Sequence, residues 1–127
     1  MPVALKLLLV EDDPAVRQLL CGALRDAGYD VTSVERFEEA DREIDTGDYD
    51  LVITDVRLPG GSGANLAHKA RALGRSAILV TGYDDVRQLL ERTEVPHLTK
   101  PFRLAQLFAA INEMFPQATR TANDGGH

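Results

Sequence analysis

The sequence predicts an α/β fold in which helices cover both faces of a parallel sheet. Short apolar runs alternate with helical patterns five times along the chain, which is typical of strand–helix units. The apolar runs, such as LLLV at residues 7–10, are continuous rather than alternating. Continuous runs are expected when both faces of each strand are buried. The 127 residues suffice for one domain with a single core.

The first half of the chain contains three predicted strands, at residues 5–10, 29–34 and 49–56, and two predicted helices. Asp13 and Pro14 form a helix start, with Asp13 as the N-cap, and Gly28 ends this first helix. Its apolar stripe is Val16, Leu19, Leu20, Ala23, Leu24 and Ala27, and Cys21 lies off that stripe as an ordinary small residue. The second helix carries Phe37, Ala40 and Ile44 and closes at Gly47.

The second half begins with RLPGGSG, residues 57–63, a loop by composition. Strands are expected at residues 77–82 and briefly within 95–102. Three further helices are marked by their apolar residues: Leu66, Ala67, Ala70 and Leu73; then Val86, Leu89 and Leu90; then Leu104, Leu107, Phe108, Ile111 and Phe115. We therefore expect one domain over residues 1–115, followed by a flexible polar tail at 116–127.

Composition excludes several classes of function. The formal net charge of −6 argues against direct binding of nucleic acid. No apolar run approaches the ~20 residues that a membrane span requires, and MPVALKLLLVEDD is too short and too soon acidic for a signal peptide. Cys21 is the single cysteine, which fits a reducing compartment, and we expect a cytoplasmic protein.

Polar side chains cluster where the predicted strands end, and ligands of open parallel sheets bind at this edge. Each residue alone has an ordinary explanation as a helix cap or loop residue. Together they predict a functional site: Glu11, Asp12 and Asp13 after the first strand, Asp55 after the third, Thr81 after the fourth, and Lys100 with Pro101 after the fifth.

These groups suit phosphoryl transfer. Carboxylate oxygens suit Mg²⁺, which keeps several waters and also binds phosphate oxygens. A carboxylate is a competent nucleophile toward phosphorus and gives an aspartyl phosphate. A hydroxyl and an ammonium are suitable partners for the phosphoryl oxygens. Asp55 is the best phosphoryl carrier, because it ends a central strand beside an open loop.

Four segments of the chain resemble the receiver domain of two-component response regulators. They are LLLVEDDPAVR, YDLVITDVRLPGGSG, ILVTGY and LTKPF, in the family's order and near its spacing, within a resemblance that covers residues 4–115. Four such segments in register are specific to this family. The resemblance implies a flavodoxin-like (βα)5 doubly wound sheet with the strand order 2-1-3-4-5.

The resemblance also implies roles for the site residues. Asp55 would be the phosphoacceptor, and Arg17 sets the register that makes Glu11 and Asp12 the acidic pair. Asp12, Asp55 and the backbone carbonyl of Arg57 would bind Mg²⁺ directly, with Glu11 acting through a water and Mn²⁺ as a substitute metal.

By the same resemblance, Thr81 and Lys100 would each bind a phosphoryl oxygen, and the Lys100–Pro101 peptide would be cis. His97 stands where the family has a Tyr or Phe switch residue, although a half-exposed strand residue is an equal explanation. Arg57 and Tyr83 would flank the phosphoryl group and slow its hydrolysis. A shorter lifetime in the Arg57→Asn, Tyr83→Glu double variant would support this.

The implied function is a phosphorylation switch fed by a histidine kinase or histidine phosphotransfer protein and read by a downstream protein target. The domain would catalyse only its own phosphorylation and dephosphorylation. Too few residues follow the last helix for an output domain, so we expect a stand-alone receiver, with a fragment of a longer chain as the alternative. Thr81 and Lys100 are closer along the chain than in chemotaxis-type receivers, which shortens a helix used for dimerisation and favours a monomer or weak dimer.

Two further functions are considered beside this one. The first is a binding module of the same fold that works without phosphorylation, although every expected site residue is present. The second is a Mg²⁺-dependent phosphatase with an Asp nucleophile, but such enzymes need a second acid two residues on, where this chain has Arg57. The sequence argues against a dinucleotide-binding site, because no G-x-G-x-x-G motif follows the first strand.

Overall fold

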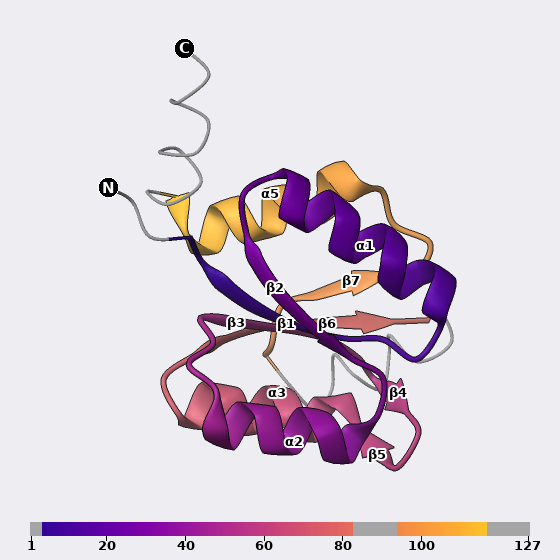
Figure 1. The fold of residues 1–127 in the computed structure, drawn as a ribbon, viewed down its shortest axis with the longest axis vertical. Coiled ribbons are helices and arrows are strands. Elements are labelled where there is room, and N and C mark those ends of the chain that lie inside the picture. The colour runs from indigo at the N-terminus through magenta and orange to yellow at the C-terminus, as the bar shows by residue number, and fades with distance from the viewer. Residues whose placement is uncertain (1–3, 83–93, 117–127) are drawn as a thin grey trace.

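The computed structural model describes residues 4–82 and 94–116 (Figure 1). Its main sheet contains five parallel strands in the order β2-β1-β3-β6-β7. The strands are β1 (Lys6–Val10), β2 (Asp30–Val34), β3 (Leu51–Asp55), β6 (Ser76–Thr81) and β7 (His97–Thr99). Since β6 and β7 are the fourth and fifth parallel strands, the predicted flavodoxin-like order 2-1-3-4-5 is confirmed.

Helices form a layer on each face of this sheet. Figure 1 shows α1 (Pro14–Asp26) and α5 (Leu104–Met114) on one face, and α2 (Phe37–Thr46) and α3 (Gly63–Ala72) on the other. No helix within the described ranges is long and apolar enough to cross a membrane. The predicted helix at Val86–Leu90, Tyr83 and the tail beyond Pro116 lie outside the described residues.

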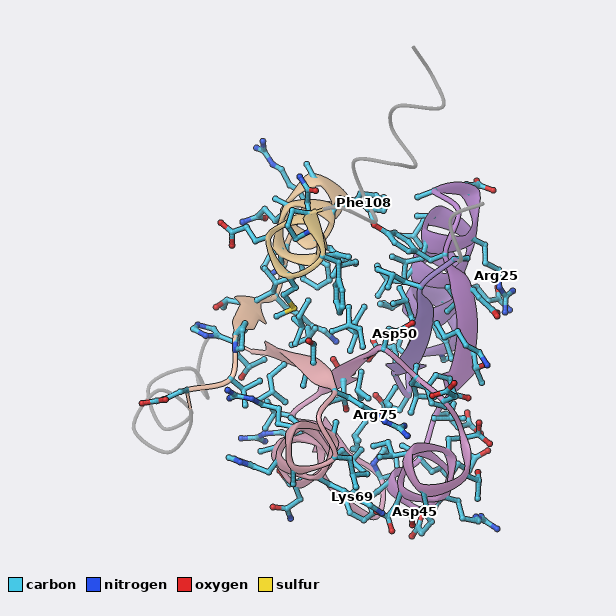
Figure 2. The ribbon with its side chains drawn as sticks, turned by 90° about the vertical axis from the view of Figure 1, so that its left-hand side faces the viewer. Arg25, Asp45, Asp50, Lys69, Arg75 and Phe108 are labelled. Atoms are coloured by element: carbon cyan, nitrogen blue, oxygen red, sulfur yellow. The ribbon has the colours of Figure 1, made fainter. Side chains whose placement is uncertain are left out.

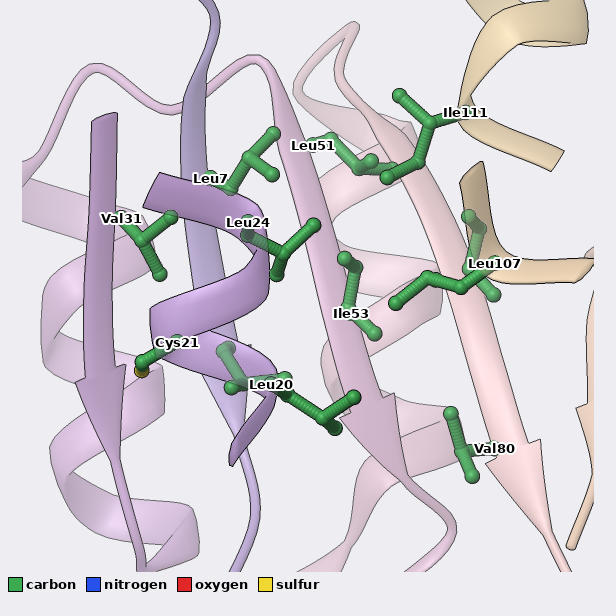
Figure 3. Close-up of a cluster of buried hydrophobic side chains, with 12 residues drawn as sticks. Leu7, Leu20, Cys21, Leu24, Val31, Leu51, Ile53, Val80, Leu107 and Ile111 are labelled. Atoms are coloured by element: carbon green, nitrogen blue, oxygen red, sulfur yellow. The ribbon is translucent and has the colours of Figure 1, made fainter. Parts of the chain in front are cut away.

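The core lies on both faces of the sheet. Alternate residues of a strand point to opposite faces, so Leu7 and Leu9 of β1 join the cluster under α1 and α5, while Leu8 and Val10 join the cluster under α2 and α3. Figure 3 shows the first cluster, in which Leu24 of α1 packs over the sheet. All five residues of β3 are buried, which explains its continuously apolar start.

The start of α1 is as predicted, but its buried face is not. The Asp13 carboxylate accepts hydrogen bonds from the amides of Ala15 (2.9 Å) and Val16 (3.3 Å), so Asp13 is the N-cap. Leu19 is 63% exposed, whereas Cys21 is 6% exposed and lies within the core. The face of α1 that packs on the sheet is therefore shifted toward Cys21 and away from Leu19, compared with the predicted apolar stripe.

The segment predicted as a loop, residues 57–63, contains a small antiparallel ladder. β4 (Arg57–Leu58) pairs with β5 (Gly61–Ser62), and Gly63 already begins α3. Strands of two residues are too short to leave a periodic signal in the sequence. This β4–β5 hairpin follows directly after the end of β3 and borders the carboxyl edge of the sheet (Figure 1).

Candidate functional site

Three carboxylates meet at the carboxyl edge of the sheet. Glu11 follows β1 and Asp55 ends β3, and these strands are parallel neighbours in which Val10 pairs with Thr54. One carboxylate oxygen from each of Glu11, Asp12 and Asp55 lies within 4.8 Å of the others. Glu11 is 2% exposed and Asp55 is 8% exposed, whereas Asp12 is open to solvent.

Lys100 directly follows the edge strand β7 and brings a positive charge to this cluster. Its Nζ lies 3.1 Å from Glu11 Oε1 and 3.1 Å from Asp55 Oδ1. The Lys100 amide donates to the Thr81 carbonyl at 2.8 Å, which ties the end of β7 to the end of β6. The Lys100–Pro101 peptide is cis. The side chain therefore bridges the two most buried acids of the site.

The site holds more negative than positive charge. Burial raises the pKa of the Asp55 carboxyl, and the hydrogen bond and charge of Lys100 oppose that rise. Asp12 adds a third carboxylate to the pair that Lys100 bridges. Closely spaced carboxylate oxygens with one exposed side are a suitable donor set for Mg²⁺. The residues present therefore fit the metal that the sequence implies.

The backbone of Glu11 is fixed at both ends. Its amide donates to the Val34 carbonyl at 3.1 Å, and its carbonyl accepts a hydrogen bond from Arg17 Nη1 at 2.9 Å. Arg17 also pairs with Glu35 at 3.6 Å. Sequence reasoning used Arg17 only to set the register of the acidic pair. In the structure, this residue helps to hold one of the acids in place.

The backbone of Asp55 is held as closely. Thr54 Oγ1 donates to the Asp55 carbonyl at 2.9 Å, and the Gly63 amide donates to the Val56 carbonyl at 2.7 Å. A β-carbon at Gly63 would overlap the Asp55 carbonyl oxygen. Gly63 is therefore required by close packing against the phosphoacceptor candidate. Sequence reasoning missed this role, and the only signal was a glycine at the end of RLPGGSG.

The remaining predicted residues that the structure describes differ in burial and in the element that carries them. Thr81 is buried at the end of β6, and its hydroxyl donates to the Gly82 carbonyl at 3.2 Å. Arg57 lies on β4 with an exposed side chain. His97 begins β7, half-buried, opposite Leu79 and three positions before Lys100. Tyr83 lies outside the described residues.

An apolar groove adjoins the charged site. It has a volume of about 490 Å³ and lies between α1 and the segment that joins β7 to α5. Its lining residues are Val16, Leu19, Leu20, Lys100, Pro101, Phe102 and Leu104. Lys100 thus contacts the acids with its ammonium and also lines this groove.

Comparisons with known proteins agree with the fold. Residues 7–112 match the family described as the response regulator receiver domain. The chain is 31% identical over 112 residues to the swarming motility regulation protein RssB of Serratia marcescens, covering 84% of this chain and 51% of that protein. It is 35% identical over 119 residues to the transcriptional regulatory protein FixJ of Azorhizobium caulinodans, covering 87% and 55%. The chain spans about half the length of these curated relatives.

Solved structures of response regulators have the same fold. A CheY-like response regulator receiver domain protein from Methanospirillum hungatei has a TM-score of 0.78 and 26% identity, covering 94% of this chain and 99% of that chain. The response regulator protein TrrA of Thermotoga maritima, solved in complex with Mg²⁺–BeF, has a TM-score of 0.78 and 32% identity, covering 87% and 99%.

The sheet order and the acid-lined edge define the class of protein, an α/β domain of the receiver type. The chain belongs to the response regulator receiver domain family, the signalling domains of two-component systems.

Proposed function

We propose that Asp55 accepts a phosphoryl group from a histidine kinase or a histidine phosphotransfer protein in a Mg²⁺-dependent reaction. The observation that carries this proposal is the meeting of Glu11, Asp12 and Asp55 within 4.8 Å, with the Lys100 ammonium 3.1 Å from Asp55. These groups at one edge of the sheet would supply a nucleophile, a metal-binding donor set and a cation for the phosphoryl group.

In the transfer, a carboxylate oxygen of Asp55 attacks phosphorus and forms the new O–P bond. The P–N bond to the donor imidazole breaks, and its electron pair stays on the imidazole nitrogen. Asp12, Asp55 and the Arg57 carbonyl would hold the metal, with Glu11 acting through a water. The metal, Mg²⁺ or Mn²⁺, supplies positive charge that neutralises the phosphoryl oxygens.

Lys100 and Thr81 then bind the phosphoryl oxygens. Phosphorylation adds a charge of roughly −1.5 to −2, which attracts the Lys100 ammonium away from Glu11. The Thr81 hydroxyl gives up its bond to the Gly82 carbonyl at little cost, because 3.2 Å is long for an O–H···O hydrogen bond. Movement of these two side chains would bias the surface that a downstream protein reads.

The domain would catalyse only its own phosphorylation and, with water as the acceptor, its own dephosphorylation. Exchange with a histidine kinase or phosphotransfer protein would occur in the cytoplasm, where Cys21 stays reduced. The second candidate function is a binding module of the same fold that needs no phosphorylation. The observation that favours it is the buried carboxylate of Asp55, whose charge Lys100 already pairs.

The test is intact mass after incubation with acetyl phosphate and Mg²⁺, and separately with a phosphorylated histidine kinase. We expect the wild type to gain one phosphoryl mass and Asp55→Asn to gain none. Asp13→Asn is the matched control, because it also removes an acid but keeps a good N-cap residue outside the three-carboxylate cluster. No gain by the wild type from either donor would contradict the proposal and leave the binding module as the leading function.

A further inference from the structure

The β4–β5 hairpin is attached to the protein at two points. At its base, Gly63 packs directly on the Asp55 carbonyl. At its tip, the Phe37 amide, at the start of α2, donates to the Pro59 carbonyl at 3.0 Å. The Phe37 side chain also packs against the buried cluster under α2 and α3, together with Leu58 of the hairpin. The hairpin is thus held between the phosphoacceptor candidate and α2.

The ring of Phe37 fills the space that a side chain at Gly61 would need. A β-carbon at Gly61 would lie 2.6 Å from both Cδ2 and Cγ of the ring, far inside van der Waals contact. The backbone of Gly61 has no positive φ, so an L-residue could adopt its conformation. Contact with the ring is therefore the constraint that makes this position a glycine.

The contact between Phe37 and Gly61 lies close to the Arg57 carbonyl, the third of the expected metal ligands. Gly61 pairs with Leu58 and Ser62 pairs with Arg57, so the position of β5 fixes the position of β4. The Arg57 backbone belongs to this ladder, and its carbonyl is the oxygen expected to bind the metal. Mg²⁺ demands near-ideal octahedral geometry, so a small displacement of one ligand weakens its binding.

We propose that Phe37 is a positioning residue for the metal site. Its ring and amide hold the β4–β5 hairpin through Gly61 and Pro59, and the hairpin in turn holds the Arg57 carbonyl in place for Mg²⁺. This inference rests on the proposed function, because it assumes a metal bound by Asp12, Asp55 and the Arg57 carbonyl. It goes beyond that function by assigning a role to a residue of α2 outside the three-carboxylate cluster.

The test is a double-mutant cycle on metal affinity, measured by calorimetry with Mg²⁺ alone. Phe37→Ala should weaken Mg²⁺ binding about tenfold, the lower end of the effect of residues that orient metal ligands. Gly61→Ala should also weaken binding, because the ring and the hairpin must move apart. In the Phe37→Ala background, Gly61→Ala should cause no further loss, because the clash is gone. Phe37→Leu, which keeps part of the contact, should restore most of the affinity.

A second readout and a control separate positioning from general destabilisation. Hydrogen exchange at the amide of residue 37 should speed up in Phe37→Ala, reporting the loosened bond to Pro59. Ile44→Val, a small cavity in the same helix, should lower stability and leave Mg²⁺ affinity unchanged. If the wild type binds Mg²⁺ and Phe37→Ala binds it equally well, or the Gly61 and Phe37 effects simply add, the inference is wrong while the proposed function stands. If the wild type itself binds no Mg²⁺, the proposed function fails first.

Discussion

Two lysines of this protein each bridge two carboxylates, with very different results. Lys100 Nζ lies 3.1 Å from Glu11 and 3.1 Å from Asp55 at the edge of the sheet. Lys69 Nζ, on α3, lies 2.7 Å from Asp41 and 2.8 Å from Asp45, both on α2. Figure 2 shows Lys69 beside Asp45. The acid side chains are 2% and 10% exposed at Lys100 but 43% and 56% exposed at Lys69.

Both lysines pair with two carboxylates, so this pairing alone does not identify a metal site. Burial and surplus negative charge distinguish the candidate metal site at Lys100 from the surface ion pairs at Lys69. At Lys69, two exposed acids one helical turn apart raise the pKa of the ammonium by hydrogen bonding, and the group links α2 to α3. At Lys100, Asp12 adds a third carboxylate, and burial raises the pKa of Asp55. The first arrangement has one surplus negative charge on exposed groups that solvent screens, whereas the second has two at a mostly buried site and still favours an additional cation.

Lys100→Met should have the largest effect on the metal-free protein. It leaves Glu11 and Asp55 without their cation. Losing one partner of a fully buried ion pair typically costs about 3–5 kcal/mol, and the loss here should be smaller because the Lys100 side chain is 39% exposed. The free energy of unfolding, measured with urea in EDTA, should still fall further than it does in Lys69→Met. A loss no larger than that of Lys69→Met would contradict the distinction between the two networks.

Mg²⁺ should stabilise the protein through the carboxylates around Lys100 and not through those around Lys69. At a metal concentration 100 times its dissociation constant, the free energy of unfolding should rise by about 2.7 kcal/mol. Asp12→Asn should remove most of this gain, because it removes a proposed ligand from the cluster. Asp13→Asn and Lys69→Met should keep it. Equal stabilisation of Asp12→Asn and the wild type in thermal melts would place the metal elsewhere.

The sequence predicted the architecture well, because the fold depends on patterns that repeat. Continuous apolar runs predicted the parallel sheet, and Asp13 as an N-cap predicted the start of α1. The rotation of α1, which exposes Leu19 and buries Cys21, could not be predicted, since periodicity defines a stripe but not how the sheet meets it. The part of α1 near Arg17 is also constrained by the hydrogen bond from its side chain to the Glu11 carbonyl, a contact that apolar periodicity does not encode.

The sequence predicted that Glu11, Asp12, Asp55 and Lys100 lie at one edge of the sheet, but it did not predict their contacts. Parallel strands bring their carboxyl ends together, so Glu11, Asp55 and Lys100 were expected near one another. The pairing of Lys100 with Glu11, 89 positions away, depends on side-chain geometry that no spacing encodes. The roles of Gly63 and Phe37 follow from close packing around the hairpin, and two-residue strands leave no pattern to read.

The smallest expected effect belongs to Lys69, and its pH dependence tests why. Lys69→Met should lower the free energy of unfolding by less than about 1 kcal/mol at neutral pH, because its partners are exposed and screened. The folded-state pKa of Lys69 is raised above the ordinary 10.5, so its contribution is complete below that pH and is lost as pH rises through the folded value. The difference between variant and wild type in urea unfolding should therefore vanish at high pH and shrink in salt. A difference that persists unchanged at high pH would mean that the lysine stem, through packing, stabilises the contact between α2 and α3.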